Sequence, residues 1–237
     1  MYGWRARLGL IVPSTNTVME SELRKYSSEE ISIHTDRMFI EAATVENLIR
    51  MHSYSKKCAK CLASAKVDVI IYGCTAGSLI KGKGYEKEIE KEIEDLVGIP
   101  TVTASSAVVD FLKSKKIKKI VVATPYIDEL NKKEKEFLEE YGFEVIAIRG
   151  LGIKNPVEIG KLDPHIAYYL SSKLLKENDG ADALFISCTD FRTFEIIKPL
   201  IRDFNKPVIS SNLASLWSAL RKVNVSTSLL EADLINL

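Results

Sequence analysis

Two cysteines stand at matching places in the sequence, each near the end of an apolar run and directly before a threonine. Cys74 follows the run Val67–Tyr72, and Cys188 follows the run Ala183–Ser187. A thiol in such a place can act as a nucleophile, or as an acid or base. Two opposed thiols could move a proton from one face of a ligand to the other, or one could add to a ligand that the other protonates. Cysteine is also a common core residue, but the matched Cys-Thr pairs favour chemistry.

Short apolar runs alternate with longer amphipathic stretches along the chain. Several runs are continuous, which is typical of strands buried on both faces of a parallel sheet. We expect strands at Leu8–Val12, Ile31–His34, Val67–Tyr72, Thr101–Thr103, Ile117–Ala123, Val145–Ile148, Ala183–Ser187 and Pro207–Ile209. We expect helices over Thr44–Lys66, over Tyr85–Val97 up to Gly98, over Asp128–Tyr141 up to Gly142, and from Pro164 to Asn178 after the N-cap Asp163. This alternation predicts an α/β fold with doubly wound parallel sheets.

The chain contains two copies of one plan. Pro13 and Cys74 lie 61 positions apart, and Pro125 and Cys188 lie 63 apart. The order of landmarks predicts two similar lobes, residues 1–110 and 111–237, related by a pseudo-twofold axis, with terminal helices that can cross between them. Because ligands bind outside the carboxyl ends of parallel strands, we expect the active site in the cleft between the lobes. The matching segments are Leu8–Pro13 with Ile120–Pro125, Val67–Thr75 with Ala181–Thr189, and Gly98–Val102 with Asn205–Ile209.

Composition narrows the class of protein. The chain has 237 residues and a formal net charge of +1, and 46% of its residues are hydrophobic. Near-neutral charge gives no drive toward nucleic acid or an anionic membrane, and this apolar content is incompatible with wholesale disorder. No run approaches the roughly 20 apolar residues of a membrane span. We therefore expect a cytoplasmic protein, and the absence of glutamine beside abundant Lys, Glu and Ile favours a thermophilic source.

Other motifs favour no chemistry. Cys58 and Cys61 form a CxxC inside a predicted helix, which favours packing, with a labile disulfide as the alternative. The run Gly77–Lys83 is nearly a phosphate-binding loop but has Gly84 in place of the magnesium-binding hydroxyl. The three histidines are far apart, without the spacing of metal ligands or of a catalytic triad. A basic cluster at Lys113–Lys119 fits a solvated helix end.

The sequence resembles the Asp/Glu racemase superfamily, most closely its branch of maleate cis-trans isomerases and arylmalonate decarboxylases. The resemblance rests on the motifs Pro13–Glu20, Gly73–Ser78, Ser187–Thr189 and Ser211–Trp217. Amino-acid racemases of the superfamily carry a Gly-rich first loop and an Asn-Thr after the first cysteine, and both are absent here. Decarboxylases of the branch keep only the second cysteine, so the presence of both favours isomerase or racemase chemistry.

The resemblance implies a site without a cofactor or metal that acts on a small dicarboxylate, in a protein that forms a homodimer. Cys74 would add to the double bond of maleate, the single bond would rotate, and elimination would release fumarate. Cys188 would supply or orient the proton. Carboxylate ligands would be Asn16, Tyr126, Asn155 and the backbone amides near Ser14, Thr15, Thr75, Ala76 and Thr189.

Each supporting residue also has a plainer explanation. Asn16 could cap a helix after Pro13, Tyr126 could be a half-buried loop residue, and Asn155 could belong to an ordinary turn. The enzyme alternatives are racemisation of an amino acid or hydantoin by the two cysteines, and decarboxylation of a malonate. A different class is a small-molecule binding protein that keeps the cleft without catalysis.

The flanking residues predict unequal thiols. Cys74 is surrounded by neutral residues, so amides at a helix N-terminus could favour its thiolate. Asp190 lies two residues after Cys188, and its charge opposes a second thiolate there, although Arg192 could offset that charge. We therefore expect Cys74 to be the thiolate and Cys188 the thiol.

Overall fold

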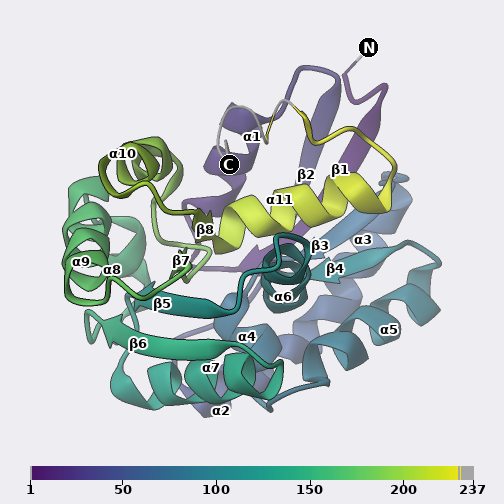
Figure 1. Cartoon of the computed structure of the whole chain (residues 1–237). Coiled ribbons are helices and arrows are strands. Elements are labelled where there is room, and N and C mark those ends of the chain that lie inside the picture. Colours follow the sequence, from purple (N-terminus) through teal and green to yellow (C-terminus); the bar gives the residue numbers. More distant parts are fainter. Residues whose placement is uncertain (1, 229, 231–237) are drawn as a thin grey trace.

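The computed structural model describes residues 2–228 and residue 230, and within them it shows two parallel sheets wrapped by helices (Figure 1). The first sheet has the strand order β2-β1-β3-β4, and the second has the order β6-β5-β7-β8. The strands are β1 (Ala6–Pro13), β2 (Ile31–Met38), β3 (Val69–Tyr72), β4 (Thr101–Thr103), β5 (Lys119–Thr124), β6 (Glu144–Gly150), β7 (Ala183–Ile186) and β8 (Val208–Ser210). The helices are α1 (Met19–Tyr26), α2 (Val45–Met51), the 3₁₀ helix η1 (His52–Tyr54), α3 (Ser55–Ser64), α4 (Thr75–Leu79), α5 (Tyr85–Val97), α6 (Ala104–Ser114), α7 (Asp128–Glu140), α8 (Pro156–Gly160), α9 (Pro164–Glu177), α10 (Phe194–Phe204) and α11 (Ser211–Lys222).

The predicted α/β fold is confirmed, and every predicted strand is present; β4 has the predicted bounds, and the others differ at their ends. The inner strands β3 and β7 are buried along their whole length, which explains their continuous apolar sequences. Helix α5 has the predicted bounds, and Gly98 ends it in the left-handed conformation with φ of 69°. Asp163 caps α9 by accepting a hydrogen bond from the backbone N–H of His165, as its place before a proline predicts.

The single helix predicted over Thr44–Lys66 is wrong, because η1 separates α2 from α3. At the break the His52 ring packs edge-on against Tyr72, with 5.8 Å between ring centroids. The Ser53 hydroxyl donates to the backbone oxygen of Arg50 at 2.8 Å, which competes with the helical hydrogen bonds of that turn. Tertiary packing and a local side-chain bond thus tighten one turn inside an otherwise helical stretch.

The duplicated plan is visible in matching strand orders and in matching local bonds. Asp68, just before β3, accepts a hydrogen bond from the backbone N–H of Arg7 at 2.7 Å. Asp182, just before β7, accepts one in the same way from Lys119 at 2.8 Å. In each lobe the carboxylate therefore joins the start of the third strand to the first, as expected of two copies of one fold.

Helices α6 and α11 lie between the two sheets (Figure 1). Helix α11 follows β8 of the second sheet, but it also packs against β3 and β4 of the first sheet and against α6. The predicted boundary between residues 110 and 111 falls inside α6, and the division into lobes at that point stays a prediction. Over the part of the chain that the structure describes, every helix is too short or too polar to cross a bilayer.

The buried carboxylate of Glu22 also joins the two lobes. Glu22 of α1 accepts hydrogen bonds from the backbone N–H groups of Thr193 at 2.6 Å and of Phe194 at 3.0 Å, at the start of α10. It also accepts one from the Asn212 amide at 2.7 Å. The same amide nitrogen donates to the backbone oxygen of Thr189 at 3.1 Å. One side chain of the first lobe thus holds the start of α10 and, through Asn212, the loop after Cys188.

We predict that Glu22→Ala lowers the free energy of unfolding by about 3 kcal/mol or more, because it leaves several buried donors without an acceptor. The matched control is Glu20→Ala on the same helix, where the lost partners are Arg24 and Arg37 in partly exposed ion pairs. That change should cost about 1 kcal/mol or less. Urea denaturation measures both, and equal losses would contradict the role given to Glu22.

Candidate active site

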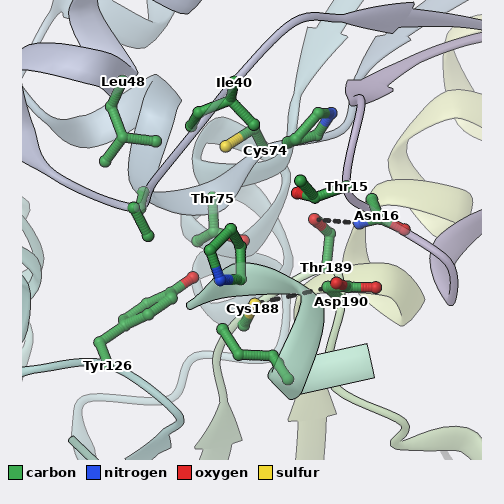
Figure 2. Close-up of a pocket in the computed structure, with 15 residues that line it drawn as sticks. Thr15, Asn16, Ile40, Leu48, Cys74, Thr75, Tyr126, Cys188, Thr189 and Asp190 are labelled. Carbon is green, nitrogen blue, oxygen red and sulfur yellow. Dashed lines mark hydrogen bonds between the residues drawn. The ribbon is translucent and has the colours of Figure 1, made fainter. Parts of the chain in front are cut away.

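A small cavity lies between the lobes, at the carboxyl ends of the strands of both sheets, and both matched cysteines line it (Figure 2). Its volume is about 50 Å³. Because one water needs roughly 10–15 Å³ by this kind of measure, the cavity suits a few waters or a small ligand. The predicted site residues that line it are Thr15, Asn16, Cys74, Thr75, Ala76, Tyr126, Cys188 and Thr189.

Cys74 stands at the turn from β3 into α4. Its Sγ accepts a hydrogen bond from the backbone N–H of Gly77 at 3.3 Å and so caps the helix. A Cβ atom on residue 77 would lie 2.9 Å from this sulfur, a separation that side chains do not reach without a shift. Glycine at position 77 therefore lets the backbone approach the thiol.

Cys188 stands at the equivalent turn after β7, in a backbone conformation rare for a residue with a side chain. Its φ is 97°, a conformation that costs roughly 1–3 kcal/mol and persists only where the surroundings hold it. The surroundings here are the Ser211 hydroxyl, which accepts from the Cys188 N–H at 3.2 Å, and the N–H of Asp190, which donates to Sγ at 3.4 Å. Backbone strain at this thiol is consistent with a functional rather than a merely packed cysteine.

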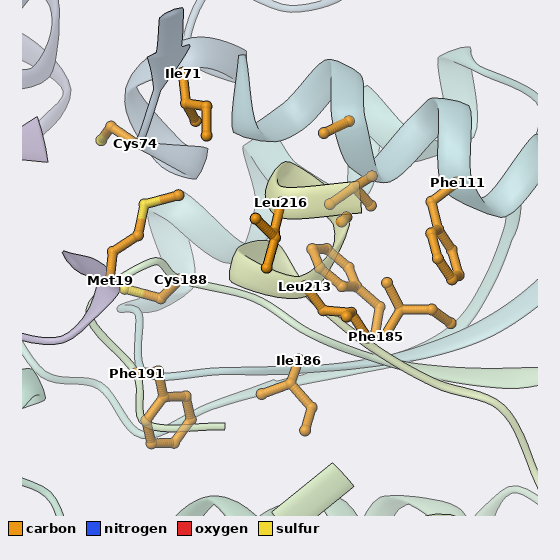
Figure 3. Close-up of a cluster of buried hydrophobic side chains, with 14 of the residues drawn as sticks. Met19, Ile71, Cys74, Phe111, Phe185, Ile186, Cys188, Phe191, Leu213 and Leu216 are labelled. Atoms are coloured by element: carbon orange, nitrogen blue, oxygen red, sulfur yellow. The ribbon is translucent and has the colours of Figure 1, made fainter. Parts of the chain in front are cut away.

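Both thiols also border the apolar core around α11 (Figure 3). Burial raises the pKa of Cys74 to about 12, and the N–H of Gly77 offsets only part of that rise. Burial likewise raises the pKa of Cys188, and the Asp190 carboxylate raises it further. The predicted thiolate at Cys74 is therefore wrong for the protein at rest, since α4 is too short and Cys74 too buried. With both pKa values raised, the neutral thiol is the favoured form of both cysteines near pH 7.

Asn16 accepts hydrogen bonds from backbone N–H groups at the start of α1, as the plainer explanation predicts, and it also bonds to the loop after Cys188. Its Oδ1 accepts hydrogen bonds from the backbone N–H groups of Val18 at 3.1 Å and Met19 at 3.0 Å. Its Nδ2 donates to the Thr189 hydroxyl at 3.1 Å. That hydroxyl donates to the backbone oxygen of Gly73, beside the first cysteine, at 3.0 Å. The asparagine therefore connects the two cysteine loops.

Tyr126 and Thr75 complete the polar part of the wall. Tyr126 lies in the loop after β5 but is only 5% exposed, so it is buried rather than half-buried as the plainer explanation had it. Its hydroxyl is directed into the pocket (Figure 2), and the Tyr126 side chain lowers the pKa of Cys188, against the effect of burial. The Thr75 hydroxyl donates to the Ser211 hydroxyl at 2.8 Å, so Ser211 touches both cysteine loops.

Two predicted ligands lie outside the lining. The Ser14 hydroxyl accepts from the backbone N–H of Ile40 at 3.1 Å and so shapes the loop after β2. Asn155 is exposed, and its Oδ1 caps α8 by accepting from the N–H of Val157 at 3.2 Å. Their part in substrate binding stays a prediction.

The lining also contains residues that the sequence did not single out as ligands. The sequence singled out Asp190 only for its charge, and Ile40, Ala43 and Leu48 come from segments without any motif. Pro156 directly follows the predicted Asn155, so the segment of that motif borders the cavity. The additional lining residues are Pro13, Ile40, Ala43, Leu48, Pro156, Ile159 and Asp190.

The motifs set aside remain outside the site. Cys58 is buried, which confirms packing for it, whereas Cys61 is exposed, and neither forms a disulfide. Gly77 is inside α4, and Lys83 donates to the backbone oxygen of Glu140 at 2.9 Å rather than facing a phosphate pocket. Over the described residues, no group of three or more His, Cys, Asp or Glu side chains could hold a metal ion.

Comparison with known proteins supports the resemblance to the branch of maleate cis-trans isomerases and arylmalonate decarboxylases. Residues 8–232 match the family model described as arylmalonate decarboxylase. The maleate isomerase of Alcaligenes faecalis is 28% identical over 235 residues, which cover 93% of this chain and 92% of that protein.

Two solved structures are similar over almost the whole chain. One is a variant of the maleate isomerase of Pseudomonas putida S16 with maleate, at a TM-score of 0.89 and 27% identity, covering 94% of this chain and 93% of that one. The other is a Cys-to-Ser variant of the Nocardia farcinica maleate cis-trans isomerase with a covalently bound succinylcysteine intermediate, at a TM-score of 0.89 and 25% identity, covering 96% and 99%. The family model spans nearly the whole chain and includes both cysteine loops, and the protein therefore belongs to the arylmalonate decarboxylase family.

Proposed function

We propose that the protein is a cofactor-independent isomerase that converts a small cis-dicarboxylate into its trans isomer, with maleate and fumarate as the pair. The observation that carries this proposal is the meeting of Cys74 and Cys188 in one small cavity between the lobes. The similarity to maleate isomerases over most of both chains supports it. A succinylcysteine in one of these relatives supports addition of a thiolate to the double bond.

The two thiols divide the chemistry of the proposed reaction. Cys74 first loses its proton to water. Its thiolate then adds through sulfur to one alkene carbon, and the π electrons move to the neighbouring carbon. Cys188 gives its proton to that neighbour and becomes a thiolate, which leaves a succinyl group on Cys74. The new C–C single bond rotates. The Cys188 thiolate then takes the proton back, the C–S bond breaks, and Cys74 leaves as a thiolate with fumarate as the product.

The polar wall provides donors for the substrate carboxylates. Asn16 and Tyr126 line the cavity with an amide and a hydroxyl. The backbone around Thr75, Ala76 and Thr189 lies at the turns that follow β3 and β7, where N–H groups face a ligand. Rigid donors of this kind can hold both carboxylates while the central bond turns.

Racemisation by the same pair is the second candidate, because two thiols on one cavity equally suit proton removal and return. A homodimer, a cytoplasmic location and a thermophilic source rest on the sequence alone and stay predictions.

We predict that the purified protein converts maleate to fumarate, measured by proton NMR, and that Cys188→Ser slows conversion by about 10²–10⁴-fold. Cys74→Ser should lose at least as much, because it removes the nucleophile. Cys61→Ser is the matched control, since that thiol is exposed and outside the site, and it should keep full activity. No fumarate from the unaltered protein would contradict the proposal, and exchange of aspartate, glutamate or hydantoin protons in D2O would favour the racemase.

The raised pKa of Cys74 predicts how its reactivity depends on pH. Because this pKa lies at about 12, the thiolate fraction at neutral pH is small and grows with pH. Alkylation of Cys74 by iodoacetamide should accelerate about tenfold per pH unit between about pH 7 and 10. Mass spectrometry of the labelled peptide measures the rate at this residue alone. A rate that is constant over this range would show that Cys74 is already a thiolate at rest.

A further inference from the structure

Asp190 is a buried acid in the wall of the cavity that the proposed reaction does not use. It follows Cys188 by two residues, is 5% exposed and lines the cavity. Figure 2 shows its carboxylate beside Thr189 and near Asn16. A negative charge here lies next to the place where a dicarboxylate would bind.

The contacts of Asp190 compensate its charge only in part. Oδ1 accepts from the backbone N–H of Thr17 at 2.7 Å, whereas Oδ2 is buried without a hydrogen-bond partner among the described residues. A Cβ on Gly160 of α8 would lie 3.0 Å from Oδ1 and 3.2 Å from Oδ2, so α8 covers the carboxylate. One oxygen therefore lacks the donor that a buried carboxylate normally requires.

The surroundings of Asp190 bring its pKa close to neutral pH. Burial raises its pKa to about 7, against the N–H groups at the start of α1 and the positive charge of Arg37 on β2, which lower it. Arg37 is shared, since it donates to the backbone oxygen of Asn16 at 2.6 Å and lies 3.6 Å from Glu20 of α1. On the cavity side the facing groups are Cys74 and Cys188, and the Asp190 charge raises the pKa of both. No group on the cavity side offers Asp190 a positive charge in the part of the chain that the structure describes.

We propose that Asp190 sets the charge of the ligand that the site accepts, so that a dicarboxylate binds together with one proton, whereas the monoamide of the same acid binds without one. This inference rests on the proposed function, because it concerns the substrate of that reaction. A dianion beside an ionised Asp190 would put three negative charges in one small cavity, where burial strengthens their repulsion. Protonation of Asp190 removes one of them, and a monoanionic ligand avoids the need for it.

The proton count on binding tests the proposal without turnover. In a Cys74→Ser background, calorimetric titration at about pH 8 in buffers of different ionisation enthalpy measures the protons taken up. We expect about one proton with maleate and about none with maleamate. Adding Asp190→Asn, which keeps an acceptor for the N–H of Thr17, should abolish the uptake with maleate. Equal uptake with and without Asp190→Asn would overturn the proposal.

Glu134→Gln is the matched control, because Glu134 is the other buried acid near Cys188. It accepts from the Ser187 hydroxyl at 2.5 Å, and burial raises its pKa to about 7 as well, but it does not line the cavity. Its replacement should leave the uptake with maleate unchanged. Loss of uptake in Glu134→Gln with retention in Asp190→Asn would assign the proton to Glu134 and overturn the proposal.

Turnover gives a second readout. Because both substrates react with Cys74, ionisation of the thiols changes both kcat/KM values alike and cancels in their ratio. The ratio of kcat/KM for maleate to kcat/KM for maleamate should fall about tenfold per pH unit above about pH 7, and Asp190→Asn should flatten it. If maleate neither binds nor reacts, the proposed function fails, and succinate with succinamate then supply the dianion and the monoanion for the titration. If maleate or succinate binds without proton uptake, the role given to Asp190 is overturned.

Discussion

The hydrogen bonds of Ser211 to both cysteine loops are the constraint on which the rest of the site depends. This hydroxyl accepts from the Thr75 hydroxyl and from the backbone N–H of Cys188. Ser211 is the first residue of α11, the helix that packs against both sheets. The position of one helix thus sets the relation between two turns that belong to different lobes. A ligand in the cavity meets the two thiols in a fixed arrangement because α11 fixes both loops.

The same packing that fixes the thiols also suppresses their ionisation. Cys74 and Cys188 border the apolar core, so each loses solvation that a thiolate would need. Burial therefore has opposite effects on the two steps of the proposed reaction. It keeps Cys188 protonated as a proton donor, but it hinders the addition by Cys74, which has to lose its proton first. Burial thus keeps the proton on Cys188 for transfer but leaves little of the Cys74 thiolate before substrate binds.

Much of the architecture followed from the sequence because it rests on local patterns. Continuous apolar runs identified the strands, and Gly98 and Asp163 marked helix ends through their own conformational preferences. The duplication placed Cys74 and Cys188 in one cleft because equivalent turns of two copies face each other. The break at His52 was not predictable, since it depends on Tyr72 packing from a distant strand.

The site was predictable only as far as its motifs extend. Tyr126 lines the cavity as expected, whereas Asn155 is exposed and its neighbour Pro156 takes the place in the wall. The state of the Cys74 thiol was predicted from its neutral neighbours in the chain, but burial by residues far away in sequence decides it.

The central claim is that Cys74 forms a covalent bond to the substrate while Cys188 handles the proton. Intact-mass and peptide mass spectrometry of the Cys188→Ser variant after mixing with maleate tests this most directly. The account predicts a gain equal to the mass of one maleic acid, located on Cys74. An adduct on another residue, or no adduct at a concentration of maleate that saturates the site, would contradict it.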